Sequence, residues 1–198
     1  MAVIPAAVCL FCGSSSGTRP ATVDGVRAFA VALVGHGLGL VYGGGHTGLM
    51  GAAADAAIAA GGRVVGVIPE HLVARERAHR TLDELIVVGS MHERKATMAQ
   101  HSEAFVAAPG GIGTLEELFE VLTWQYLDLH SKPVALLNLD GFYDPLLDFL
   151  RNCVERGFLA ADTLARLVVH TDPQALADWL ATTLSGAPAT ADLPVDRL

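Results

Sequence analysis

Apolar residues along the chain follow two alternating patterns. Stretches with the helical spacing of apolar positions occur near residues 20–36, 47–61, 90–102, 114–128, 143–156 and 173–184. Between them are short, mostly apolar runs typical of strands buried on both faces, at Ala7–Cys12, Leu38–Tyr42, Val64–Ile68, Glu84–Val88, Ala104–Ala108, Val134–Asn138 and Leu167–His170. Strands separated by helices of this length need crossover connections. The pattern therefore predicts an α/β fold with a doubly wound, mostly parallel sheet and helices on both faces.

We expect a single Rossmann-like domain over residues 1–184, because the chain is long enough for one sizeable core and no linker divides it. Residues 185–198, rich in Ala, Pro and Asp, are predicted to form a loose tail. Ligands of such sheets bind beyond the carboxyl ends of the strands. Glycine-rich turns follow the first, second and fifth predicted strands, at Gly13–Gly17, Gly43–Gly48 and Gly110–Thr114. We expect the functional site to lie there.

Composition and charge restrict the possible partners. A formal net charge of −8 argues against a nucleic-acid backbone as the main partner. No run approaches the 18 or so apolar residues of a membrane span, and Met1–Ala7 lacks the basic segment of a secretory signal. Three cysteines, an odd number, fit a reducing compartment. We therefore expect a cytoplasmic protein that acts on a small molecule, without nucleic-acid or membrane partners.

The cysteines and histidines do not predict a metal site. Cys9 and Cys12 have the C-x-x-C spacing, but residues three apart in a strand point to opposite faces, so we expect two separate buried thiols. The eight histidines are scattered, and His92 and His101 are too far apart on one predicted helix to share an ion. We expect no bound metal.

The stretch Pro109–Glu117, PGGIGTLEE, is the strongest candidate for chemistry. It joins a buried strand to a helix, so the backbone N–H groups of its glycines and the helix dipole can bind a phosphate. Thr114 adds a hydroxyl group, and Glu116 and Glu117 would stand beside the phosphate. The alternative is a simple tight turn followed by acidic residues that favour the helix dipole.

This pattern, PGGxGTxEE, resembles the signature of the Lonely Guy family. Its members are cytokinin riboside 5′-monophosphate phosphoribohydrolases that were once described as lysine decarboxylases. A second segment, Met91–Lys95 (MHERK), is similar to the family's MHxRK. The resemblance extends over about residues 7–160 through Cys12–Ser15, Tyr42–Gly45, Gly66–Pro69 and Lys132–Val134.

The resemblance implies hydrolysis of the N-glycosidic bond of a nucleoside 5′-monophosphate, without a cofactor and in a homodimer. The favoured substrates of plant-like members are N6-substituted adenosine monophosphates, and the products are the free base and ribose 5-phosphate. The implied catalytic residues are Arg94, which orients the phosphoribosyl group, and Glu117, which stabilises the oxocarbenium-like transition state. The expected substrate-binding residues are Gly13, Ser14, Gly44, Gly45, Glu76, Lys95, Gly110, Gly111, Ile112, Gly113, Thr114, Leu115, Glu116 and Thr123.

The sequence also allows two other functional interpretations. Molybdenum-cofactor carriers and other nucleotide binders share the expected fold without being hydrolases. Gly43-x-Gly45-x-x-Gly48, followed by Glu70, matches the dinucleotide fingerprint of an NAD-dependent oxidoreductase. Glu76 lies in a polar segment, Glu70–Arg80, that is either a solvated loop or a flap over the ligand.

Overall fold

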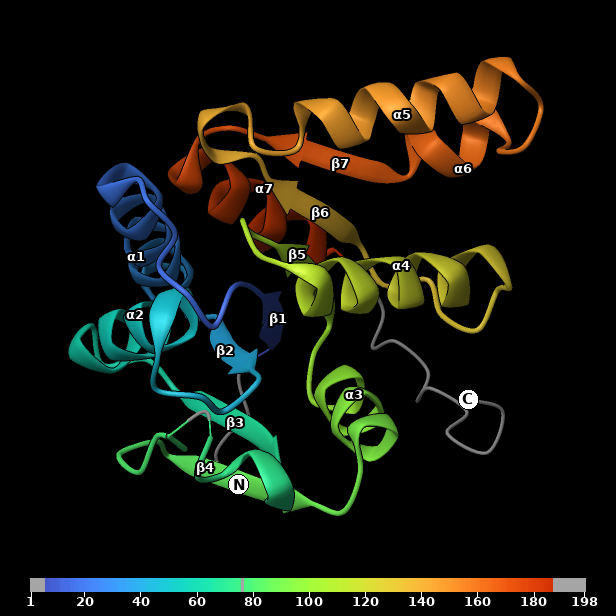
Figure 1. Cartoon of the computed structure of the whole chain (residues 1–198). Helices are drawn as coiled ribbons and strands as arrows, with labels where there is room; N and C mark the ends of the chain where they lie inside the picture. Colours follow the sequence, from blue (N-terminus) through green and yellow to red (C-terminus); the bar gives the residue numbers. More distant parts are fainter. Residues whose placement is uncertain (1–5, 76, 187–198) are drawn as a thin grey trace.

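The structure is a computed structural model that describes residues 6–75 and 77–186. Its strands form one parallel sheet in the order β4-β3-β2-β1-β5-β6-β7 (Figure 1). The strands are β1 (Ala7–Phe11), β2 (Gly39–Tyr42), β3 (Val64–Pro69), β4 (Glu84–Val88), β5 (Ala104–Ala107), β6 (Val134–Leu137) and β7 (Leu167–His170). The predicted fold class and all seven predicted strands are confirmed.

The helices on both faces also match the pattern of apolar positions. They are α1 (Pro20–Gly35), α2 (Gly48–Ala59), α3 (Met91–Gln100), α4 (Ile112–Tyr126), α5 (Asp144–Glu155), α6 (Ala161–Ala165) and α7 (Pro173–Ser185), with short 3₁₀ helices η1 (Glu70–Leu72) and η2 (Leu139–Gly141). The six long helices were predicted. The other three are too short to show a period. The predicted tail begins at the last residue of α7, and its residues 187–198 lie outside the described chain.

Successive strand residues point to opposite faces of the sheet and so belong to two separate hydrophobic cores. One core packs α1, α2 and α7 on one face of the sheet, with Phe29 and Leu180 fully buried. The other packs α3, α4 and α5 on the opposite face around residues such as Leu118. Cys9 belongs to the second core and Cys12 to the first, and both thiols are free. The prediction that the two cysteines face opposite ways is confirmed.

The strand order reverses at β1, which lies between β2 and β5. In an open parallel sheet this switch point leaves a crevice between the loops that follow the two diverging strands. The loops are joined by hydrogen bonds. The Gly13 N–H donates to the Pro109 carbonyl at 3.1 Å, and the Gly13 carbonyl accepts from the N–H groups of Leu49 and Met50 at 3.0 and 3.3 Å. The three predicted glycine-rich turns therefore lie together at one edge.

Within the described residues, no helix combines the length and the apolar character required to cross a bilayer.

Candidate functional site

A pocket of about 210 Å³ opens at this switch point. Arg94 and Glu117, the two residues expected to be catalytic, both line it. The remaining lining residues come from the ends of β1 and β2, from α2 and α3, and from the glycine turn with the start of α4: Leu10, Cys12, Gly13, Ser14, Gly43, Met50, Met91, Gly111, Ile112, Gly113, Thr114 and Glu116. The pocket thus combines two opposite charges with a helix N-terminus.

Arg94 is placed by the start of α3. Ser90 caps the helix by accepting from the Glu93 N–H at 3.1 Å, and the Glu93 carboxylate accepts from the Gly89 N–H at 2.7 Å. This arrangement is close to a capping box, and it satisfies backbone donors at the helix start. Arg94 follows within the first turn. The capped first turn of α3 therefore fixes the position from which the Arg94 side chain enters the pocket.

Two backbone carbonyls then fix the Arg94 guanidinium group. Nε donates to the Val67 carbonyl at 3.2 Å, and Nη2 donates to the Gly43 carbonyl at 2.8 Å. Arg94 is only 5% exposed. A planar guanidinium held by two carbonyls keeps its remaining N–H groups in a set direction, which suits recognition of a phosphate or of ribose hydroxyls.

Gly43 makes this arrangement possible, and the sequence-based site did not include it. A β carbon at position 43 would overlap Nη2 of Arg94. The signal was present in the Tyr42–Gly45 segment, but a run of three glycines does not show which of them needs a bare backbone. The structure identifies Gly43, because a side chain at this position would meet the guanidinium group of Arg94.

Glu117 lies half-buried in the second turn of α4 and adds negative charge to the pocket. Burial, and then the charge of Glu117, raise the pKa of the Cys12 thiol. Burial and Glu117 also raise the pKa of Cys9, which the charge of Arg94 lowers. Cys12 therefore stays protonated at the pocket wall and cannot serve as a thiolate nucleophile.

The glycine turn is held by a hydrogen bond before it and is closely packed where it meets α4. The buried Tyr143 hydroxyl donates to the Ala108 carbonyl at 2.7 Å, which fixes the chain just before the turn. On the other side, a β carbon at Gly110 would meet the buried Thr114 side chain. Gly111 is the N-cap of α4, and no side chain of the described residues caps the helix there. The first N–H groups of α4 and the helix dipole can therefore bind an anion.

The other expected site residues are distributed over several surroundings. Gly110 borders the pocket through the turn, and Leu115 packs against the second core. Gly44 packs on Ile68 and Gly45 pairs with Ala78, and neither lines the pocket. Thr123 donates to the Phe119 carbonyl at 2.6 Å and lines a separate apolar groove. Glu76 lies outside the described residues.

Lys95 joins two helices and is not among the residues that line the pocket. Its Nζ donates to Glu116 at 2.5 Å and to Glu120 at 2.8 Å. Burial disfavours the charged lysine, but the hydrogen bonds and charges of the two carboxylates outweigh burial and raise its pKa. Lys95 therefore ties α3 to α4, and its contact with substrate stays a prediction.

Lys95→Met is expected to lower the free energy of unfolding by about 1–2 kcal/mol near neutral pH, because Glu116 and Glu120 are then left as like charges four residues apart. A lysine with a raised folded-state pKa contributes stability below its unfolded pKa of 10.5 and loses it above the folded one. Urea denaturation from about pH 7 to about pH 11 should show the difference shrinking. Arg151→Met, which breaks an exposed pair with Asp148, is the control and should change stability little. Equal effects of the two variants would contradict the tie between the helices.

The glycines that match the dinucleotide-binding fingerprint, Gly43-x-Gly45-x-x-Gly48, lie in a turn that packs against the turn after β1. The N–H groups at the start of α2 bond to the Gly13 carbonyl, so they are not directed at a pyrophosphate. Gly48 has a φ of +64°, and a β carbon there would overlap the backbone of Ser14. These glycines therefore allow two turns to approach closely, as they must to close the pocket of Arg94 and Glu117.

Comparison with known proteins identifies relatives of this chain. The family model described as "Possible lysine decarboxylase" matches residues 50–180. A cytokinin riboside 5′-monophosphate phosphoribohydrolase of Arabidopsis thaliana is 53% identical over 152 residues, which are 77% of this chain and 67% of that protein. Another of the same name and organism is 47% identical over 85% of this chain and 78% of that protein. One from Oryza sativa subsp. japonica is 48% identical over 85% of this chain and 69% of that protein.

Solved structures with low sequence identity share the fold. The molybdenum cofactor carrier protein of Chlamydomonas reinhardtii aligns with a TM-score of 0.70 at 22% identity, over 92% of this chain and 99% of that chain. The molybdenum cofactor binding protein of Rippkaea orientalis aligns with a TM-score of 0.69 at 21% identity, with the same coverage. The sequence matches over most of the chain decide the family, and it is the family that the two sequence motifs resemble. The chain belongs to the Lonely Guy family of phosphoribohydrolases.

Proposed function

We propose that this protein hydrolyses the N-glycosidic bond of N6-substituted adenosine 5′-monophosphates and releases the free base and ribose 5-phosphate. The observation that carries the proposal is that Arg94 and Glu117 line one pocket at the N-terminus of α4. A helix N-terminus suits the 5′-phosphate, and a carboxylate close by suits the charge that develops on the sugar.

The reaction breaks the bond between the sugar C1′ and the base nitrogen and forms a bond from C1′ to a water oxygen. The positive charge on the ribosyl ring grows as the base leaves, and Glu117 stabilises it and orients the attacking water. The water's surplus proton leaves the new hydroxyl, and the base departs with a proton. Arg94 orients the phosphoribosyl group but does not supply that proton, because a guanidinium group stays charged at working pH.

The phosphate should contribute to catalysis although it does not react. Its binding energy can place the scissile bond against Glu117, so a nucleoside without phosphate should be a poor substrate. The test is to incubate the protein with AMP, N6-isopentenyl-AMP and adenosine and to separate free base and ribose 5-phosphate by chromatography. Release from either nucleotide but little from adenosine supports the proposal, and the ratio of the two nucleotide rates reports the N6 preference. Equal turnover of adenosine and AMP would refute it, and binding without turnover would indicate a carrier.

We further propose that the protein is a cytoplasmic homodimer joined through α4, α5 and α6. An apolar groove of about 300 Å³ lies between these helices, and the aromatic residues around it are exposed, Tyr126 by 62% and Phe158 by 85%. Such a surface favours a second copy of the chain. Light scattering should give twice the chain mass and should give the single mass for Phe158→Asp. A wild-type monomer would contradict the dimer.

A further inference from the structure

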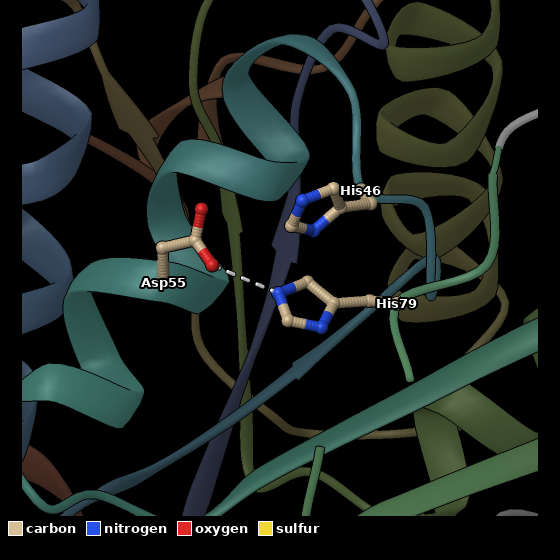
Figure 2. Close-up of side chains that lie close together, drawn as sticks. All are labelled: His46, Asp55 and His79. Carbon is tan, nitrogen blue, oxygen red and sulfur yellow. Dashed lines mark hydrogen bonds and ion pairs between the residues drawn. The ribbon is translucent and has the colours of Figure 1, made fainter. Parts of the chain in front are cut away.

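Three side chains that are far apart in the sequence meet outside the pocket of Arg94 and Glu117. His46 follows the turn after β2, Asp55 lies on α2, and His79 belongs to the segment between η1 and β4 (Figure 2). One potential ligand atom from each lies within 4.8 Å of the other two. None of the three lines the 210 Å³ pocket. The cluster is therefore a site separate from the proposed catalytic one.

We propose that His46, Asp55 and His79 bind one first-row transition-metal ion, with Zn²⁺ as the best fit. Bonds of about 2.0–2.2 Å in a tetrahedral arrangement place two ligand atoms roughly 3.3 Å apart. Nε2 of His79 and Oδ1 of Asp55 are already 3.0 Å apart. The rings of His46 and His79 lie 4.3 Å apart, edge to face, and His46 is exposed, so a rotation of its ring brings a nitrogen to the ion.

His79 is the fixed member of the cluster. It is 2% exposed, and its backbone N–H donates to the Gly44 carbonyl at 2.9 Å. Its Nδ1 lies 3.2 Å from Oγ1 of Thr81. The Thr81 backbone N–H donates to the same Nδ1 at 3.4 Å, so in this structure Nδ1 is an acceptor. A metal on Nε2 would place the proton on Nδ1 and replace this long bond with one from Nδ1 to the hydroxyl. Thr81 thus supplies the outer partner that metal-binding histidines usually have.

The types of ligand atom in the cluster select the type of ion. Arg77 and Arg80 line a hollow of about 450 Å³ together with His46 and His79. The two guanidinium groups disfavour every cation, Zn²⁺ included, so the ligand types decide which ion binds. A single carboxylate provides too few oxygen ligands for Ca²⁺ or Mg²⁺. Direct bonds to two imidazoles suit Zn²⁺ instead. Three protein ligands leave the fourth position for water from the hollow.

A bound ion would connect three segments, two of which contribute Gly43 and Met50 to the pocket of Arg94 and Glu117. The Gly43 carbonyl that accepts from Arg94 lies three residues before His46. Hydrogen bonds from His46 N–H to Arg77 and from His79 N–H to Gly44 already join the segments of the two histidines. Through Asp55, the ion would also join α2 to these two segments. It would stabilise the protein because it binds the folded chain and not the unfolded one.

The test is titration of the metal-depleted full-length protein, without an added histidine tag, by isothermal calorimetry with Zn²⁺. We expect one equivalent to bind to the wild type and neither Mg²⁺ nor Ca²⁺ to bind. His46→Ala and Asp55→Asn should each weaken Zn²⁺ binding by at least about 10-fold, since even outer-partner changes cost about 10- to 100-fold. These exposed positions avoid the risk that a change at the buried His79 unfolds the protein.

His36→Ala is the matched control, because His36 forms an exposed pair with Asp178 at 2.7 Å without a second histidine. It should bind Zn²⁺ like the wild type. Co²⁺ should give the visible absorption of a tetrahedral ion in wild type and control, and lose it in the two site variants. Absence of binding would show that His79 and Asp55 form only a structural hydrogen bond. Binding that the site variants leave unchanged would place the ion elsewhere. Either result overturns the proposal, and both are independent of the phosphoribohydrolase assay.

Discussion

Glu117→Gln is expected to lower kcat for nucleotide hydrolysis by about 100- to 1,000-fold, the loss typical for removal of one preorganised electrostatic group. The amide has nearly the shape of the carboxylate but carries no charge, so the oxocarbenium-like transition state loses its stabilising partner. Glu117 is only half-buried, and the core residue of α4 next to it, Leu118, is unchanged. Steady-state kinetics with the better nucleotide measure the effect.

The matched control for Glu117→Gln is Glu155→Gln, which removes the same charge from an exposed position at the end of α5. It should keep wild-type kinetics. Thermal unfolding should show that both variants remain folded. A Glu117→Gln protein with near-normal turnover would show that the carboxylate is not catalytic, even if the substrate assignment is correct.

Arg94→Lys is the second change with a large expected effect. A lysine has no planar fork, so it cannot bond to the carbonyls of Val67 and Gly43 in the observed geometry and also present N–H groups to the substrate. We expect kcat/KM to fall by about 100-fold, because misplacement by about 1 Å can cost that much. One poorly paired buried carbonyl should also cost about 1–3 kcal/mol of folding free energy, which urea denaturation measures.

Gly43→Ala separates the position of Arg94 from its chemistry. The added methyl group would overlap Nη2 and displace the guanidinium group while leaving the arginine in the chain. It should reproduce much of the kinetic loss of Arg94→Lys. Gly35→Ala at the end of α1, where a β carbon meets no atom within 4 Å, is the control and should be active. Full activity of Arg94→Lys and Gly43→Ala would show that Arg94 does not orient the substrate.

The fold was predictable because its elements are long and their apolar patterns are regular. The six long helices each bury one stripe, and the five inner strands are buried almost throughout, so the period of about 3.6 and the apolar runs are visible in the sequence. The edge strands β4 and β7 are partly exposed, but they too are short, mostly apolar runs. The five-residue α6 and the two 3₁₀ helices do not complete enough turns to show a period. Their position depends on neighbouring packed elements instead.

The candidate site was predictable only where a motif is contiguous. Pro109–Glu117 and Met91–Lys95 are local signals, and they identified the glycine turn, Arg94 and Glu117 without knowledge of the fold. Lys95 belongs to the same motif, yet its carboxylate partners on α4 could not be deduced, because their proximity depends on how two helices pack on one sheet face.

By itself, then, the sequence determined the alternation of strands and helices, the two motifs and the family they represent, since these depend on neighbours along the chain. Tertiary structure alone decided that Gly43 must lack a side chain beside Arg94, and that Thr123 faces a different groove from Glu117. It alone also brought together His46, Asp55 and His79, which the spacing of histidines did not reveal. The physical reason is that parallel strands return to the same edge through long crossovers, so residues that meet there have no fixed separation in sequence.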